Sequence, residues 1–299
     1  MATSSNTSVS HARNSGLQGW MSGFIGMVIF SGSLPATRVA VQSFDPFFLT
    51  FIRASIAGVL AVLIILALRQ HRPAPGQLFS LLIVALGVVI GFPLFTALAL
   101  QHVSSAHSIV FIGLLPMSTA LFAVIRGGER PRRAFWLFST LGCLLVMGFA
   151  LVQSAAASLT GDLLMLAATL VCGLGYAEGA LLSRHLGGWQ VICWSLILSL
   201  PIMLLATVMT APLSFEPVQA SAWWALGYVS LFSMLIGFIF WYRGLATGGI
   251  ASVGQLQLLQ PFFGLIFSAW LLHESIHPSM LVVTAAVVCC LAAARKFGR

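Results

Sequence analysis

Charged side chains are scarce in this sequence. Of its 299 residues, 14 are Lys or Arg and 6 are Asp or Glu, whereas 59% of the chain is hydrophobic. An ordinary soluble domain is about 25% charged, so these few charges cannot cover the surface of a globular protein of this length. The composition excludes a soluble enzyme and indicates that the chain uses lipid as its solvent.

Motifs for catalysis and cofactor binding are missing as well. The sequence has no Walker A motif, no residues at metal-ligand spacing and no nucleophile–base motif. ATP-driven pumping within this chain is therefore excluded, and we expect no enzyme activity, no cofactor and no metal. The basic residues form no tract, so nucleic acid is not an expected partner. The cysteines all lie inside apolar runs and are expected to be small buried hydrophobes; they are Cys143, Cys172, Cys193, Cys289 and Cys290.

Long apolar runs are abundant instead. Ten can be delimited, each about 20 residues long, which is the length that a helix needs to cross a bilayer. They are apolar all round and lack the alternation of barrel strands, so the predicted fold class is an all-α integral membrane protein. Residues 1–16 are polar and are expected to form a disordered cytoplasmic N-terminus. The runs are 18–39, 46–68, 77–100, 103–125, 134–153, 160–183, 189–210, 221–242, 250–272 and 277–295.

The basic residues gather on one side of the expected membrane. If the N-terminus is inside, only Arg38 and Arg53 fall toward the outer side, both within or at the end of a run. The positive-inside rule therefore predicts that both termini are cytoplasmic, in a multi-pass protein of the inner (plasma) membrane. The residues on the inner side are Arg13, Arg69, Arg72, Arg126, Arg130, Arg132, Arg133, Arg184, Arg243, Arg295, Lys296 and Arg299; the outer connections carry Asp45, Asp162, Glu216 and Glu274.

The two halves of the chain resemble each other. With an offset of 145 residues, Pro116 aligns with Pro261 and Glu129 with Glu274. This predicts two repeats of five helices, 17–154 and 155–297. Five is an odd number, so the second repeat must enter the membrane in the opposite sense. Such inverted repeats are typical of secondary transporters, whose substrate site lies near the midplane between the repeats.

These features resemble a known family. The two five-helix halves, Asp45-Pro46 followed by Arg53, and a Pro in spans 4 and 9 followed by a Glu are similar to the drug/metabolite transporter superfamily. The resemblance is to its ten-helix EamA-type members, and most to the YddG-like amino-acid and drug exporters. It implies a basket with a central cavity lined by spans 1, 3, 4, 6, 8 and 9. It also implies efflux of amino acids, related metabolites and amphipathic toxicants by alternating access, with dimer contacts formed by spans 5 and 10.

Small residues and Pro interrupt spans 1 and 6 at similar depth, in 30–35 and 172–176. Such stretches free backbone groups beside a cavity, although close helix packing through small residues explains them too. Pro116 and Pro261 are candidate hinges, and a static kink is the alternative. Span 9 carries three amides, Gln255, Gln257 and Gln260, of which one or two are expected to line the cavity; Gln255 can face the substrate, and an interhelical hydrogen bond is the alternative. The candidate cavity residues are Phe30, Ser33, Phe92, Phe95, His107, Phe111, Leu115, Tyr176, Phe238, Trp241, Tyr242 and Gln255.

Few ionisable groups lie inside the spans. Arg53 could attract a substrate carboxylate or pair with Asp45, and we favour a structural role. Glu178 could bind an amine or a proton, or form an ion pair with Arg184. His107 could take up a proton or serve as an interfacial hydrogen-bonding group.

The predicted function is export of amino acids, neutral or aromatic ones among them, and of related small metabolites through a weakly charged cavity. The expected partners are the substrate and the bilayer, with the protein a monomer or weak dimer. Proton coupling and facilitated diffusion both stay open. One alternative is a cationic-drug exporter, which would need a central carboxylate. A remote one is a lipid-modifying membrane enzyme, which would need a metal or an acid–base cluster.

Overall fold

The computed structural model describes residues 4–128, 132–152, 158–215, 218–248 and 253–297, and these residues form helices without any strand. Seven helical stretches are long and apolar enough to cross a membrane, which confirms a multi-pass helical membrane protein. They are Leu17–Ala40, Pro46–Ala67, Pro75–Ala99, Ser105–Arg126, Leu159–Leu186, Gly188–Thr210 and Ala220–Thr247. The remaining three predicted runs contain helices that are not among these seven, so the number ten stays a prediction.

Several spans consist of more than one helical element. Helices α1, α2 and α3 cover Ser4–Ser31, Ser33–Ala40 and Pro46–Ala67, and the next span joins η1, α4, η2 and α5. The elements of that span are η1 (Pro75–Gln77), α4 (Leu78–Val84), η2 (Ala85–Gly91) and α5 (Phe92–Ala99). They are followed by α6 (Ser105–Ile112), α7 (Leu115–Gly127), α8 (Arg133–Val152), α9 (Leu159–Leu186) and α10 (Gly188–Thr210). The last elements are α11 (Ala220–Tyr228), η3 (Val229–Ile236), α12 (Gly237–Gly248), η4 (Gly254–Leu259), α14 (Gln260–Leu272) and α15 (Pro278–Phe297).

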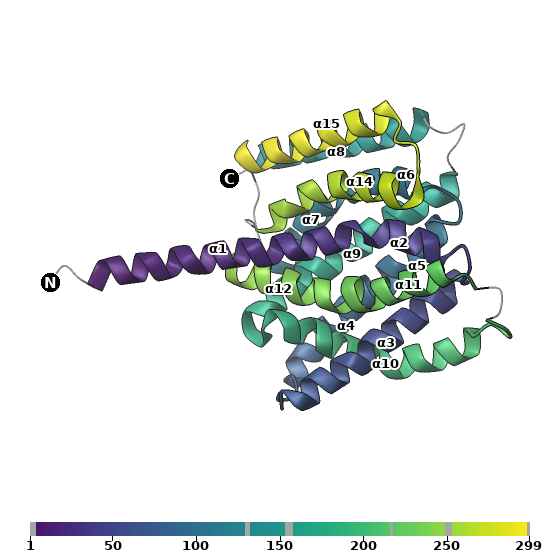
Figure 1. The fold of residues 1–299 in the computed structure, drawn as a ribbon. Helices are drawn as coiled ribbons and strands as arrows, with labels where there is room; N and C mark the ends of the chain where they lie inside the picture. Colours follow the sequence, from purple (N-terminus) through teal and green to yellow (C-terminus); the bar gives the residue numbers. More distant parts are fainter. Residues whose placement is uncertain (1–3, 129–131, 153–157, 216–217, 249–252, 298–299) are drawn as a thin grey trace.

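The helices lie side by side in one bundle (Figure 1). Helix α1 packs along α12, α3 along α10, α7 along α9 and α8 along α15. The start of α1 and the end of α15 lie at the same end of the bundle, which we call the terminal face. The opposite end is the distal face. Asp45 and Ser104 are the N-caps of α3 and α6, Asp162 lies in the first turn of α9, and Glu274 follows the end of α14; these four residues belong to the distal face.

Two expectations about local order differ from the structure. Residues 4–16 were expected to be disordered, but they are helical and form the first part of α1. Extending a helix from an existing span costs little free energy, because each added residue completes one hydrogen bond.

The described cysteines are free thiols as expected, but Cys289 is exposed on α15, whereas Cys172 and Cys193 are buried. An exposed thiol on a membrane helix faces an apolar solvent, so burial inside the protein is not needed.

Irregular backbone is concentrated in five spans. The first span breaks at Gly32, between α1 and α2. The third and eighth spans contain the π-helical segments η2 and η3. The fourth span breaks between α6 and α7, and the ninth begins as the 3₁₀ segment η4 before α14. By contrast, α9 runs unbroken through 172–176, so the interruption predicted for span 6 is wrong.

The small residues of α9 serve close packing instead. A Cβ atom on Gly173 would lie 2.1 Å from Oγ of Ser118 in α7, and one on Gly175 would lie 2.7 Å from a methyl carbon of Val88 in η2. Both distances are shorter than the non-bonded contacts that real Cβ atoms make. Glycine at these positions therefore lets neighbouring helices approach α9, as small residues commonly do between membrane helices.

Candidate functional site

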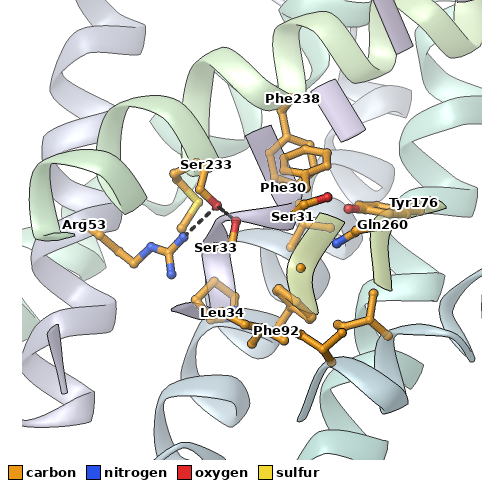
Figure 2. A pocket seen from close by; sticks show the side chains of 16 residues that line it. Phe30, Ser31, Ser33, Leu34, Arg53, Phe92, Tyr176, Ser233, Phe238 and Gln260 are labelled. Atoms are coloured by element: carbon orange, nitrogen blue, oxygen red, sulfur yellow. Dashed lines mark hydrogen bonds between the residues drawn. The ribbon is translucent and has the colours of Figure 1, made fainter. Parts of the chain in front are cut away.

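A small cavity lies where the irregular segments meet (Figure 2). Its volume is about 20 Å³, which is room for roughly one water molecule. The walls come from both halves of the chain, because α1, α2, α3, η2, α5, α6, α9, η3, α12 and α14 all contribute. The lining residues are Phe30, Ser31, Ser33, Leu34, Arg53, Val88, Phe92, Pro93, Ile109, Ile112, Tyr176, Ser233, Met234, Phe238, Gln260 and Gly264.

The helix break at Gly32 shapes one wall of the cavity. Tyr228 donates a hydrogen bond of 2.7 Å to the carbonyl oxygen of Ile29, in the last turn of α1. A Cβ atom on Gly32 would lie 2.5 Å from that hydroxyl, so only glycine leaves room for the tyrosine. On the other side of the break, Ser33 begins α2, and its Oγ lies 2.6 Å from Oγ of Ser233 in η3. The break therefore brings hydroxyl groups from both halves to one place.

Arg53 of α3 extends its guanidinium to the edge of this cavity (Figure 2). The side chain is 4% exposed. Its Nη2 donates to the carbonyl oxygen of Val229 at 3.1 Å and to Oγ of Ser233 at 3.3 Å. Val229 is the first residue of η3, where the i→i+5 pattern of hydrogen bonding replaces the α-helical one. Within the described residues, Nε of Arg53 has no hydrogen-bond partner and no carboxylate forms an ion pair with Arg53.

Asp45 does not form an ion pair with Arg53, which was one of the two interpretations of Arg53 from the sequence. Its Oδ1 instead accepts hydrogen bonds from the backbone N–H groups of Phe47 and Phe48, at 2.8 and 3.1 Å. Asp45 is thus the N-cap of α3, with Pro46 in the first helical turn. The guanidinium of Arg53 lies on the same helix but about two turns further along, beyond the reach of a capping carboxylate.

The amide of Gln260 lies across the cavity from Arg53 (Figure 2). Gln260 is the first residue of α14 and is 6% exposed. In the described part of the chain its Oε1 has no hydrogen-bond partner. A buried amide oxygen without a partner is costly, and so is a buried guanidinium N–H without one. The cavity therefore has an unsatisfied polar group at each of two opposite sides.

Aromatic rings cover the wall between these two polar groups. The ring of Phe30 lies 4.8 Å from that of Phe238 and 6.3 Å from that of Tyr176, measured between centroids. Trp241 packs behind them, 6.2 Å from Phe30. Figure 2 shows Phe92 and Leu34 on the opposite wall. The cavity thus combines polar groups with apolar surfaces that suit a hydrocarbon or aromatic side chain.

Five of the predicted cavity residues line the cavity: Phe30, Ser33, Phe92, Tyr176 and Phe238. Six others do not. Leu115, Trp241 and Tyr242 are buried in the main apolar core, and Phe111 is buried in a second one. Tyr242 also donates a hydrogen bond of 3.2 Å to the carbonyl oxygen of Gly175. Phe95 and His107 are likewise absent from the lining, and the side chain of Gln255 lies outside the described residues.

Arg53, Gln260, Ser31 and Ser233 were not among the predicted cavity residues, although binding of a carboxylate was one interpretation of Arg53 and Gln260 was one of the three amides of span 9. The available signal was the position of Arg53 and Gln260 inside apolar spans, where a polar side chain is a functional candidate by default. Ser31 and Ser233 gave no such signal, because serine is common in membrane helices.

His107 and Glu274 belong to a contact network at the distal face. Nε2 of His107 lies 2.7 Å from Oδ1 of Asp162 in the first turn of α9. The carboxylate of Glu274 accepts hydrogen bonds from the backbone N–H groups of Ser105 and Ala106, at 3.1 and 2.8 Å, and from Oγ of Ser105 at 2.8 Å. A carboxylate at a helix N-terminus satisfies donors that the helix itself cannot. These contacts join α6 to α9 and to the segment that follows α14.

Glu178 forms the corresponding contact toward the terminal face. Its carboxylate accepts hydrogen bonds from Nε and Nη2 of Arg126, at 2.8 and 3.1 Å, and from Oγ of Ser80 at 2.5 Å. The partner is thus Arg126 in α7 and not Arg184, because residues on separate helices meet here more closely than residues within α9. The bidentate geometry is the strong form of such a pair.

The two candidate hinge residues both occupy the first turn of a helix. Pro116 lies at the start of α7 and Pro261 at the start of α14. A proline tolerates this position because the first N–H groups of a helix have no intrahelical partner. In the described residues no group of three or more His, Cys, Asp or Glu side chains could hold a metal ion.

In the comparisons with known proteins, the family model and the named relatives are all described as transporters or exporters. The EamA-like transporter family model matches residues 17–151 and, a second time, residues 159–294. A protein of Bacillus subtilis (strain 168) described as the uncharacterized transporter YdeK is 63% identical over 286 residues, which are 96% of this chain and 100% of that protein. A probable terminal-alkyne amino-acid exporter of Streptantibioticus cattleyicolor is 24% identical and is covered to 82%, as is this chain.

Two further likenesses are also at low sequence identity. An S-adenosylmethionine/S-adenosylhomocysteine transporter of Chlamydia trachomatis serovar L2 is 25% identical, over 89% of this chain and 85% of that protein. A protein crystal structure superimposes with a TM-score of 0.68 at 19% identity, covering 94% of this chain and 99% of the other. At that identity the likeness establishes the fold alone.

Proposed function

Because the chain belongs to the EamA-like transporter family, we propose that it is a secondary transporter that exports amino acids and related small metabolites by alternating access. The single observation that carries the substrate class is the small cavity, which has hydroxyl, amide and guanidinium groups on an otherwise aromatic and aliphatic wall. Such a site suits a small molecule with polar and apolar parts. The printed name of one relative, an amino-acid exporter, is consistent with this class.

The proposed architecture is two inverted repeats of five helices, 17–154 and 155–297. It is supported by the double match of the family model and by irregular backbone at equivalent places. The π-helical segments η2 and η3 begin 144 residues apart, at Ala85 and Val229. Pro116 and Pro261, each in the first turn of a new helix, are 145 residues apart. An inverted repeat places the substrate site between the halves, where the cavity lies.

Alternating access requires this cavity to open. A volume of about 20 Å³ is far below the 300–1,000 Å³ of typical small-molecule sites, so the described conformation is closed around its centre. The contacts of Glu274 at the distal face and of Glu178 toward the terminal face would then break in turn. Pro116 and Pro261 are the proposed hinges, because each separates an irregular segment from a regular helix.

A cationic-drug exporter of the same family is the second candidate function. It would need a carboxylate in the cavity, and none of the described lining residues is acidic. The buried charge there is the guanidinium of Arg53, which repels cations. A lipid-modifying enzyme has still less support, since the described residues contain no metal-binding cluster.

The proposed location is the inner (plasma) membrane, with both termini in the cytoplasm, so that the terminal face is the inner one. The basic residues of the sequence support this orientation. A monomer or weak dimer is the proposed assembly, and the substrate and the bilayer are its proposed partners.

Uptake of labelled amino acids into proteoliposomes, with and without a proton gradient, tests the function. We expect saturable uptake that falls at least about tenfold in Phe238→Ala, because the variant removes a cavity wall. The matched control is Trp224→Ala, whose side chain is 82% exposed on the outside of the bundle. Dependence on the gradient decides between proton coupling and facilitated diffusion. Transport of a cationic dye but of no amino acid would contradict the proposal in favour of the second candidate.

A further inference from the structure

The geometry points to Arg53 and Gln260 as a pair that selects zwitterionic α-amino acids: the guanidinium of Arg53 binds the substrate carboxylate, and the amide oxygen of Gln260 accepts from its ammonium group. This inference rests on the proposed function and deepens it by assigning the recognition of each charged group. From the sequence, a structural role was favoured for Arg53 over binding of a carboxylate, and Gln260 was one of three amides of which one or two were expected to line the cavity.

The first step of the argument is the uncompensated charge of Arg53. A guanidinium is always protonated, and this one is almost fully buried. It donates hydrogen bonds to the Val229 carbonyl and the Ser233 hydroxyl, but both acceptors are neutral and do not cancel the charge. A buried charge without a counterion is unfavourable, and it persists in membrane proteins chiefly where it serves a ligand or a pathway. A carboxylate in the cavity would supply the missing counterion.

The second step is the position of the unused donor. Nη2 of Arg53 is occupied by Val229 and Ser233, whereas Nε has no partner in the described part of the chain. Carboxylates bind arginine through adjacent N–H groups in a planar fork, so a free Nε is a competent half of such a site. The hydroxyl of Ser33, 2.6 Å from that of Ser233, lies beside the guanidinium and can donate to the same carboxylate (Figure 2).

The third step is the opposite side of the cavity. The amide of Gln260 faces Arg53 across the cavity and has an unpartnered Oε1. Rotation about the last side-chain bond exchanges its oxygen and nitrogen, so the amide can present an acceptor to an ammonium group. An amide rather than a carboxylate at this place keeps Arg53 from being neutralised by the protein itself. The substrate must then bring its own anion, and an α-amino acid brings the cation as well.

A panel of four probes tests this assignment: L-phenylalanine, L-phenylalaninamide, phenethylamine and 3-phenylpropionate. The first has both charges, the next two lack the carboxylate and the last lacks the ammonium. Competition with labelled phenylalanine in proteoliposomes is the readout, together with the thermal shift of the purified full chain. We expect the two probes without a carboxylate to compete at least about tenfold more weakly than phenylalanine, the effect of one lost hydrogen bond to a charged group.

The variants separate the two roles. Arg53→Gln should abolish the discrimination between phenylalanine and its amide, and Arg53→Lys should keep part of it, because lysine retains the charge but not the fork. Gln260→Glu should raise competition by phenethylamine and lower that by 3-phenylpropionate, through the added negative charge. Arg38→Gln is the matched control, because Arg38 donates to the carbonyl oxygen of Leu100 and does not line the cavity. It should keep the wild-type pattern.

The outcomes distinguish this inference from the proposed function. If phenylalanine is transported but its amide competes equally well, or if Arg53→Gln keeps the discrimination, the inference fails and the transporter stands. If no amino acid is transported at all, the proposed function fails and this inference fails with it. Should Arg53→Gln not fold, the wild-type panel and Gln260→Glu still decide.

Discussion

Glu274 joins parts of the chain that are about 170 residues apart in sequence. Its two carboxylate oxygens receive three hydrogen bonds from Ser105 and Ala106, at the N-terminus of α6. Oγ of Ser105 also lies 2.8 Å from Oγ of Ser268 in α14. The charge count of the sequence put Glu274 on the distal side, but nothing in the sequence indicated its partners, because the pairing depends on how α6 and α14 pack.

Replacement of this carboxylate should loosen the distal face. We expect Glu274→Gln to lower the free energy of unfolding by about 1–3 kcal/mol, because the amide nitrogen cannot accept from the Ala106 N–H and the helix N-terminus loses its negative charge. Thermal unfolding of the purified protein measures the effect. His277→Ala is the control, since His277 is exposed in the same connection and contacts Ser279 at 2.8 Å. Equal stability of the two variants would contradict the assigned role.

Close contact of backbones is the main feature at the scale of the helices. A Cβ atom on Gly26 of α1 would lie 2.9 Å from the carbonyl oxygen of Gly237 and from the backbone nitrogen of Trp241, both in α12. One on Gly244 would lie 2.6 Å from the backbone nitrogen of Gly23. Backbone atoms cannot turn aside as a flexible side chain can, so these glycines hold the first and eighth spans together.

Substitution at this contact should therefore separate two helices. Gly26→Ala is expected to destabilise the protein by about 1–3 kcal/mol, as overpacking of a tight interface does. Gly227→Ala is the control: a Cβ atom there would meet nothing within 4 Å, and alanine favours a helix by roughly 0.5–1 kcal/mol. Thermal unfolding in detergent should place the two variants on opposite sides of the wild type. A stable Gly26→Ala would show that α1 and α12 can separate freely.

The sequence predicts where helices lie better than how they are interrupted. Hydropathy located the seven helical stretches that are long and apolar enough to cross a membrane, because span length follows from bilayer thickness. The break at Gly32 was expected from its small residues and Pro35, yet a similar stretch in α9 stays helical. The π-helical segments gave no local signal, since they depend on neighbours. Five of the predicted residues line the cavity. Arg53 was interpreted as structural, because its partner is the unusual backbone of η3, which the sequence did not indicate.

Orientation in the membrane is a property of the whole molecule and can be tested by fusions. Alkaline phosphatase is active only outside the cytoplasm, where its disulfides form, and green fluorescent protein reports the inside. We expect phosphatase activity for fusions after residues 102, 213 and 275, and fluorescence after residues 71, 187 and 297. The reason is the excess of Lys and Arg near the terminal face. The reverse pattern would overturn the orientation, and a mixed pattern would contradict the inverted repeat.

A central cavity of about 20 Å³ also bears on the electrical insulation of the membrane. Protons cross proteins along chains of hydrogen-bonded waters, and space for roughly one water breaks such a chain. The fixed positive charge of Arg53 at this place adds a barrier to protons and other cations. Each elementary charge that leaks across 100 mV dissipates about 2.3 kcal/mol. In this conformation the cavity therefore offers protons no continuous chain of waters between the two faces of the membrane.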